Sequence, residues 1–211
     1  MHPADCPAWE YKNHPNYGSL GGRCSRILVS LRRGFVDVDR GLRDTRPFHG
    51  TMFSGLTPDK HEYLAGHYRG ERFRCLEHLF VVIPADPRVG TPPNFVSMDL
   101  ANFSANVLRP GLSALRAAFS IPDSRLPPED KLLYLVKYAS RVLVEFLRIH
   151  PYANGNGHAG RLVVWLILAK FGYWPKQWPL NTSPPYHQLI FEYRNGIHDP
   201  LEHFVLKSIT G

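Results

Sequence analysis

The stretch from His150 to Arg161 places groups that could hold a phosphate beside a group that could move a proton. Its sequence is HPYANGNGHAGR, with glycines on both sides of Asn156. Glycine and asparagine suit a tight turn that needs positive φ, and such a turn exposes consecutive N–H groups to an anion. His150 titrates near neutral pH and can accept a proton from a hydroxyl. Arg161 can donate bidentate hydrogen bonds to a phosphate. The stretch therefore predicts a phosphate-binding turn with a general base on its rim.

The same residues have plainer interpretations. A histidine at the end of a helix can simply cap it, because positive charge is favourable there. The Gly-Asn turn can be a tight connection and bind an anion as well. The plainer interpretation of Arg161 is an arginine on the protein surface, although the helix around it is strongly apolar. His158 is expected either to donate to a phosphate or to face solvent.

The chain on both sides of the turn has the pattern of buried helices. Before the turn, apolar residues recur at helical spacing, at Leu132, Val136, Ala139, Val142, Leu143, Phe146 and Leu147. Two prolines followed by acidic residues open this helix, and Pro151 ends it at His150. After the turn, the unbroken apolar run over residues 162–169 predicts a second helix from about Gly157 to Gly172. The N–H groups at its start would then be available to an anion.

At these residues the chain resembles the Fic/Doc family, whose motif is H-P-F-x-[D/E]-G-N-G-R-x-x-R. The matching positions are His150, Pro151, Gly155, Asn156, Gly157 and Arg161. Tyr152 replaces the family phenylalanine, Asn154 replaces an acidic residue that binds Mg²⁺, and His158 replaces the first arginine. Residues 66–70, GHYRG, are similar to the Gly-x-Tyr-Arg segment that leads into the family's target-binding flap. The likeness extends over about residues 48–204.

The resemblance implies an all-α, Fic-like helical bundle with a small β-hairpin flap. It also implies an enzyme that transfers a nucleotide monophosphate, most often AMP from ATP, to a hydroxyl of a target protein. In this interpretation His150 is the catalytic base, and Asn156 orients the phosphate that is attacked. The implied phosphate-binding residues are Asn154, Gly155, Asn156, Gly157, His158 and Arg161. The expected partner is a protein that offers a Ser, Thr or Tyr hydroxyl.

Asn154 is the position at which altered chemistry is expected. An amide keeps an oxygen ligand for Mg²⁺ but loses the negative charge of a carboxylate, so metal binding should weaken. The ion could still arrive on the nucleotide phosphates. The reaction is therefore expected to be slow, to use another donor, or to be lost. The alternative function is a catalytically weakened Fic-fold binding or regulatory subunit, which Asn154 and His158 favour and the intact His150 does not.

The family often carries an inhibitory helix with the pattern [S/T]-x-x-x-E-[G/N]. No Glu of this chain has Ser or Thr four residues before it. If the protein is restrained, we therefore expect an inhibitory partner chain or another mechanism.

Composition limits the class of protein. The 211 residues are 44% hydrophobic and 20% charged, which is typical of a folded globular chain. The formal charge of +7 is spread along the chain, so we do not expect nucleic-acid binding. No apolar run is long enough for a membrane span. The first residues do not resemble a secretory signal, and Cys6, Cys24 and Cys75 are odd in number and widely spaced, which favours a reduced, cytoplasmic setting.

Two parts are predicted along the chain: an N-terminal arm or extension over residues 1–47 and a Fic-like domain over residues 48–211. Residues 1–25 show no periodicity, which predicts an irregular arm. The flap is predicted at residues 73–93, where an apolar stretch favours a strand and prolines then interrupt the chain. Further helices are predicted at residues 97–108, with Ser97 as N-cap, and at residues 111–119, 186–195 and 200–209.

Overall fold

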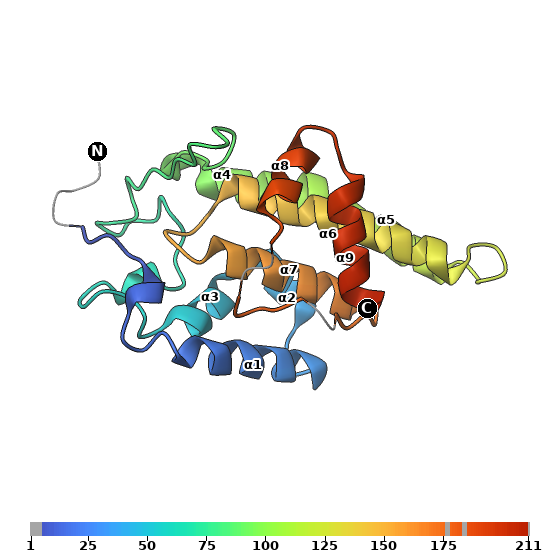
Figure 1. Ribbon diagram of the computed structural model, residues 1–211, viewed down its shortest axis with the longest axis horizontal. Coiled ribbons are helices and arrows are strands. Elements are labelled where there is room, and N and C mark those ends of the chain that lie inside the picture. Colours follow the sequence, from blue (N-terminus) through green and yellow to red (C-terminus); the bar gives the residue numbers. More distant parts are fainter. Residues whose placement is uncertain (1–5, 176–177, 183–184, 211) are drawn as a thin grey trace.

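The protein is a helical bundle built around the two helices that flank the His150 turn. The computed structural model describes residues 6–175, 178–182 and 185–210. α6 spans Pro128–Ile149 and α7 spans Asn156–Lys170, and the two pack against each other (Figure 1). Every residue of α7 from His158 to Leu168 is buried, as expected for a helix with apolar residues all round. The predicted all-α class is confirmed, and both predicted helices lie within two residues of their expected starts and ends.

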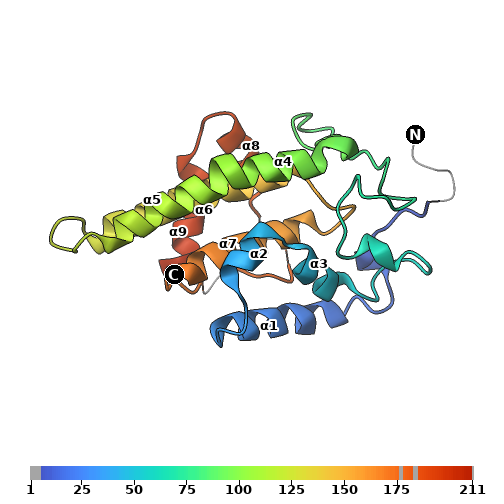
Figure 2. The same ribbon diagram turned by 180° about the vertical axis from the view of Figure 1, so that it is seen from behind.

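Helices from both ends of the chain cover this central pair. Three N-terminal helices pack on α7: α1 (Ser19–Arg32), α2 (Val38–Arg43) and α3 (Arg46–Phe53). Two C-terminal helices pack on α6: α8 (His187–Arg194) and α9 (Asp199–Thr210). In both views α7 lies between α1 on one side and α6 on the other (Figures 1 and 2). The predicted C-terminal helices are confirmed, whereas the irregular arm is wrong from Ser19 onward because α1 begins there.

A long rod of three segments lies along α6. It consists of α4 (Val96–Phe103), a π-helical turn (Ser104–Leu108) and α5 (Arg109–Ser120), which follow one another without a break (Figure 2). The two helices that the sequence predicted separately are therefore continuous. Phe95, not Ser97, occupies the N-cap of α4, so the predicted cap is wrong. A short 3₁₀ turn at Pro93–Phe95 leads directly into the helix and takes the place of a side-chain cap.

A tyrosine of α6 contacts the end of the π-helical turn. The Tyr138 hydroxyl of α6 donates a hydrogen bond to the Leu108 carbonyl at 2.8 Å. At Gly111, a Cβ atom would stand 2.0 Å from Cε2 of the Tyr138 ring. Glycine is therefore required at this position for the tyrosine to reach the carbonyl. The bond joins α6 to the end of the π-helical turn.

The predicted β-hairpin flap is wrong. Among the residues that the structure describes there is no strand, and residues 79–83 have no regular structure. Pro84, Pro87 and Pro92 lack the N–H groups that a ladder needs, so the chain turns instead of pairing. Its remaining main-chain bonds go to the end of α6: Gly90 N–H donates to the Arg148 carbonyl at 2.9 Å, and Thr91 N–H donates to the Ile149 carbonyl at 3.2 Å. The segment is a loop attached to the helix that ends at His150.

A disulfide attaches the N-terminal segment to this irregular part of the chain. Cys6 and Cys75 are bonded, and Cys24 is a buried free thiol. The expectation of three reduced cysteines is therefore wrong. The cysteines no longer support the prediction of a reducing compartment. Sequence spacing could not reveal this pair, because 69 positions separate the two residues. In the described part of the chain, no helix combines the length and apolar character that crossing a membrane requires.

Candidate functional site

The turn between α6 and α7 is held in a fixed shape by its own polar groups. His150 caps α6 with φ 55° and ψ 59°, a left-handed conformation, and Gly155 enters α7 with φ 76°. The Asn156 carboxamide bridges the turn: its Oδ1 accepts from Tyr152 N–H at 2.8 Å, and its Nδ2 donates to the Tyr152 carbonyl at 2.9 Å. At Gly155, a Cβ atom would stand 2.4 Å from the Phe53 ring. Both glycine and asparagine are thus needed to build the turn, whatever they bind.

The sequence left two roles open for His150, a helix cap or a base at the phosphate turn, and its location is compatible with both. His150 caps α6, and it also faces a cavity. Burial lowers the pKa of its imidazole to about 4, and the nearby Arg69 and Arg194 cations add to the shift. Its buried Nδ1 makes no hydrogen bond of good geometry with the described residues, and the Leu147 backbone offsets only part of the shift. The ring is therefore neutral near pH 7, which is the form that accepts a proton.

Arg69 fixes the backbone on which His150 stands. Its guanidinium is completely buried and donates to the carbonyls of His150 at 2.8 Å, Ile149 at 3.1 Å and Leu79 at 3.0 Å. Its own N–H donates to the Pro151 carbonyl at 2.8 Å. A cation at the C-terminus of α6 is favoured by the helix dipole and by the unpaired carbonyls there. Burial lowers the pKa of Arg69 to about 10, so the side chain remains charged near neutral pH.

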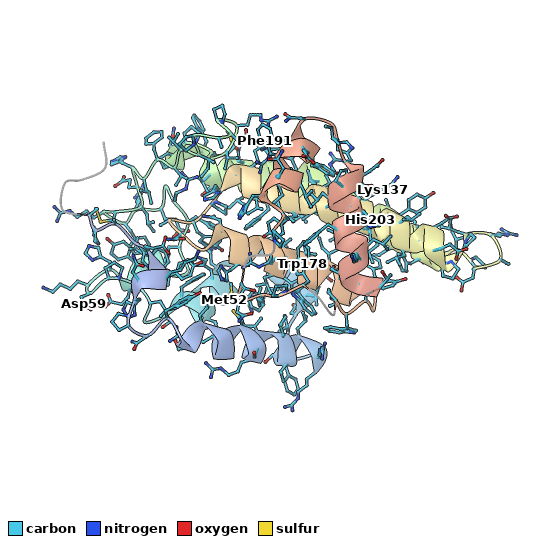
Figure 3. The ribbon with its side chains drawn as sticks, in the orientation of Figure 1. Met52, Asp59, Lys137, Trp178, Phe191 and His203 are labelled. Atoms are coloured by element: carbon cyan, nitrogen blue, oxygen red, sulfur yellow. A yellow bond between two sulfur atoms is a disulfide. The ribbon has the colours of Figure 1, made fainter. Side chains whose placement is uncertain are left out.

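A cavity of about 460 Å³ opens beside His150. Gly157, in the first turn of α7, lines the same cavity, so the candidate base and the start of the helix face one space. The other walls come from the loop before α4, from α6 and from α8, and most are apolar: Ile83, Ala85, Val89, Leu147, Ile190 and Phe191. Figure 3 labels Phe191 on α8. A space of this size and polarity is typical of a small-molecule site.

The cavity also holds one ion pair. Arg194 of α8 donates to Asp86 at 2.9 Å, and Asp86 also accepts from Arg88 at 2.7 Å. The Asp86 side chain is 6% exposed, and its two arginine partners lower its pKa to about 2. Asp86 and Arg194 line the cavity, whereas Arg88 does not. Sequence reasoning missed both residues, because nothing in their spacing links residue 86 to residue 194.

Asn154 is engaged with the N-terminal segment. Its Nδ2 donates to the Trp9 carbonyl at 2.7 Å, and its Oδ1 accepts from Gly155 N–H at 2.7 Å. The Asn154 carbonyl lies 2.9 Å from Nε2 of His49, whose Nδ1 accepts from Gly66 N–H at 2.9 Å. His49 is completely buried, which lowers its pKa to about 3, so the neutral ring donates from Nε2. The amide at position 154 thus has a donor role that a carboxylate could not fill.

These contacts do not suit Mg²⁺. The ion prefers several oxygen ligands with at least one carboxylate, and here the single side-chain oxygen already accepts a backbone N–H. In the described part of the chain, no group of three His, Cys, Asp or Glu residues lies together that could hold a metal ion. In this arrangement, the side chains of the turn do not form a set of metal ligands.

The two remaining motif side chains are buried in the protein. Arg161 is completely buried and donates to the Tyr186 hydroxyl at 3.1 Å and to the Leu180 carbonyl at 3.2 Å. It does not line the cavity, although Tyr186 does. Trp178 covers the same helix, with its indole N–H 3.3 Å from the Arg161 carbonyl (Figure 3).

His158 is 3% exposed, so a solvent-facing role is wrong. It lies edge-on to the rings of Tyr11 and Phe53, with ring centroids 5.4 Å away in each case. Burial, with the Arg161 cation, lowers its pKa to about 3. It is therefore neutral near pH 7 and does not supply the positive charge of the arginine that it replaces.

Comparison with known proteins agrees with the motif. Residues 96–168 match the model of the Fic/DOC family, a segment that runs from α4 to the last turn of α7 and contains the whole motif. The match covers about a third of the chain and confirms the resemblance to this family. The Fic/DOC family is known for transfer of nucleotide monophosphates. A search of curated proteins found no match to the chain.

Proposed function

We propose that this protein transfers a nucleotide monophosphate, with AMP from ATP as the first candidate, to a hydroxyl of a target protein. The observation that carries the proposal is the shared cavity of about 460 Å³, which both His150 and the start of α7 face. A base and the N-terminal end of a helix, where the dipole favours an anion, suit attack on a phosphate when they face one space.

The reaction needs three changes in bonding. The neutral His150 ring accepts the proton of the target hydroxyl, the hydroxyl oxygen bonds to the α-phosphorus, and the bond from that phosphorus to pyrophosphate breaks. Pyrophosphate carries away the electron pair, and the proton on His150 returns to solvent. Positioning and charge stabilisation supply most of the rate in such a transfer. No step depends on a metal ligand from Asn154.

The loop before α4 is the proposed docking place for the target. Phe80 and Val82 are 59% and 73% exposed, and Arg69 joins this loop to His150 through the Leu79 carbonyl. An exposed segment without regular structure can pair its main chain with that of a target of any sequence. A proline in place of Val82 should therefore reduce target modification without weakening nucleotide binding, and unchanged modification would argue against docking here.

The test of the function uses labelled ATP, GTP, UTP and CTP with a cell extract, with and without Mg²⁺. His150→Ala should abolish label transfer, with a loss of about 10²–10⁴ in rate. Because the pKa of His150 is about 4, wild-type activity should stay constant from pH 8 to about pH 5 and fall as pH approaches 4. His187→Ala is the matched control, since His187 also lines the cavity but lies on α8. Equal labelling by wild type and His150→Ala would remove His150 from the mechanism.

The second candidate is a Fic-fold binding or regulatory subunit. The observation that favours it is the internal use of Asn154, Asn156 and Arg161, each of which is hydrogen-bonded within the protein. Such a subunit would bind a partner and label nothing. Two results together would favour this candidate over the enzyme. No label would be transferred from any of the four nucleotides, and nucleotide binding would not change the environment of the His150 ring.

A further inference from the structure

Arg161, which the family resemblance implies to be a phosphate-binding residue, does not line the cavity that His150 faces. It is completely buried and bonded to Tyr186 and Leu180, so a phosphate in the cavity would have to displace Tyr186 to meet it. The cavity nevertheless contains a cation. Of the described residues that line it, Arg194 is the only Lys or Arg.

Arg194 has unused donor capacity. Its side chain is 10% exposed, and its buried Nε has no hydrogen-bond partner among the described residues. One of its terminal nitrogens donates to Asp86, and the other lies 3.4 Å from the Val144 carbonyl. A buried charged group gains from every hydrogen bond that its donors complete, so the weakly bonded terminal nitrogen is the one that a bound anion would engage.

The charges around Arg194 leave a net attraction for an anion. Asp86 is shared by Arg194 and Arg88, so two cations face one carboxylate and the trio carries one net positive charge. Glu145 also acts on Arg194, but it is itself paired with Arg148. The start of α7, whose helix dipole favours an anion, faces the same cavity through Gly157. His150, neutral near pH 7, adds no repulsion toward a phosphate.

We propose that Arg194 takes the place of Arg161 and holds a phosphate of the donor nucleotide between α8 and the start of α7. The ligand class rests on the proposed function, and the recognised group is a phosphoanion. Asp86 positions the guanidinium by holding one of its terminal nitrogens, and the other, which makes only the long contact with the Val144 carbonyl, is the donor for the ligand. The apolar walls from Ile190 and Phe191 would then contact the rest of the nucleotide.

The test is calorimetric titration of the full chain with ATP, pyrophosphate and adenosine, without added metal. Arg194→Met should weaken binding of ATP and of pyrophosphate by about 10-fold or more, which is the worth of one charged hydrogen bond. Adenosine, which lacks a phosphate, should be affected by less than about 2-fold on the same scale. Arg194→Lys should restore part of the loss.

Arg88→Met is the matched control. It removes the other partner of Asp86 and with it the net positive charge of the trio, but Arg88 does not line the cavity, so its loss of ATP affinity should be clearly smaller than that of Arg194→Met. Equal losses in Arg88→Met and Arg194→Met would overturn the proposal, as would wild-type protein that binds neither ATP nor pyrophosphate. Thermal melts of each variant show whether a loss of binding reflects a loss of fold, and a folded Arg194→Lys with recovered binding supports the proposal even if Arg194→Met unfolds.

This result is separable from the proposed function. Anion binding that depends on Arg194, without label transfer to any hydroxyl, would support the site and refute the transferase. Label transfer that is unchanged in Arg194→Met would support the transferase and refute the site.

Discussion

Replacing Asn154 with aspartate should destabilise the protein, although aspartate or glutamate is what the family motif carries there. The variant loses the N–H that donates to the Trp9 carbonyl at 2.7 Å and sets a carboxylate oxygen against that carbonyl. An acceptor left unpaired in a partly buried place costs about 1–3 kcal/mol. For a chain of this size, that corresponds to a melting temperature lower by roughly 2–12 °C.

The loss should depend on pH, and its sign follows from the contact. A carboxylate that faces a carbonyl has its pKa raised in the folded state, so the folded protein favours the protonated form. The protonated acid can donate its O–H to the Trp9 carbonyl and restore the bond. The stability of Asn154→Asp should therefore approach that of wild type at low pH and fall as pH rises through the raised pKa.

The assay is urea unfolding at pH 4, 5.5 and 7, with Asn154→Ala as the control. Alanine removes the same donor without adding a charge, so its loss relative to wild type should be independent of pH. The reasoning is refuted if Asn154→Asp is as stable as wild type at pH 7, or if its loss follows that of Asn154→Ala at every pH. A repeat with millimolar Mg²⁺ adds a second question, because stability that returns only with the ion would indicate a metal site at this turn.

Three further outcomes follow from contacts at the edges of the site. Cys75→Ser should lower the free energy of unfolding by about 4 kcal/mol in urea titrations, because the disulfide closes a loop of nearly seventy residues, and an unchanged midpoint would show that the loop is not closed in solution. Tyr186→Phe should cost about 1–3 kcal/mol in thermal melts, because the buried Arg161 guanidinium loses an acceptor while it stays buried, and an equal stability would contradict that bond. Asp86 has a pKa of about 2, so its stabilisation is complete above pH 5 and is lost as pH falls toward 2; the stability difference between wild type and Asp86→Asn should shrink over that range, and a constant difference would argue against the pair with Arg194.

The helices around the turn could be predicted from the sequence, whereas the surroundings of the motif side chains could not. Pro128 and Pro151 bound α6, and the apolar run after Gly157 defines α7, because these signals act within one or two turns of helix. The predicted β-hairpin was wrong because an apolar stretch forms a strand only if another strand pairs with it. The prolines after residue 83 remove N–H donors that this pairing would need.

The partners of Asn154 and Arg161 lie far away in the sequence. Trp9 is 145 positions from Asn154, and Tyr186 reaches Arg161 from the N-cap of α8. Periodicity predicts that a position is buried, but it does not say which distant group will bond to it. Arg69 is the intermediate case, since the sequence singled out its segment by resemblance but could not show that the side chain binds the carbonyl of His150.

The contacts of the N-terminal segment bear on how this protein should be dissected. A fragment that began at residue 48 would leave the amide of Asn154 without the Trp9 carbonyl, and would remove the Tyr11 ring from Phe53 and His158. The fragment would contain the whole motif sequence but would lack the N-terminal residues that contact it. An inactive fragment of that kind would therefore say little about the chemistry of the motif. Substitutions over residues 6–11 would affect the phosphate turn directly, although these residues lie far from it along the chain.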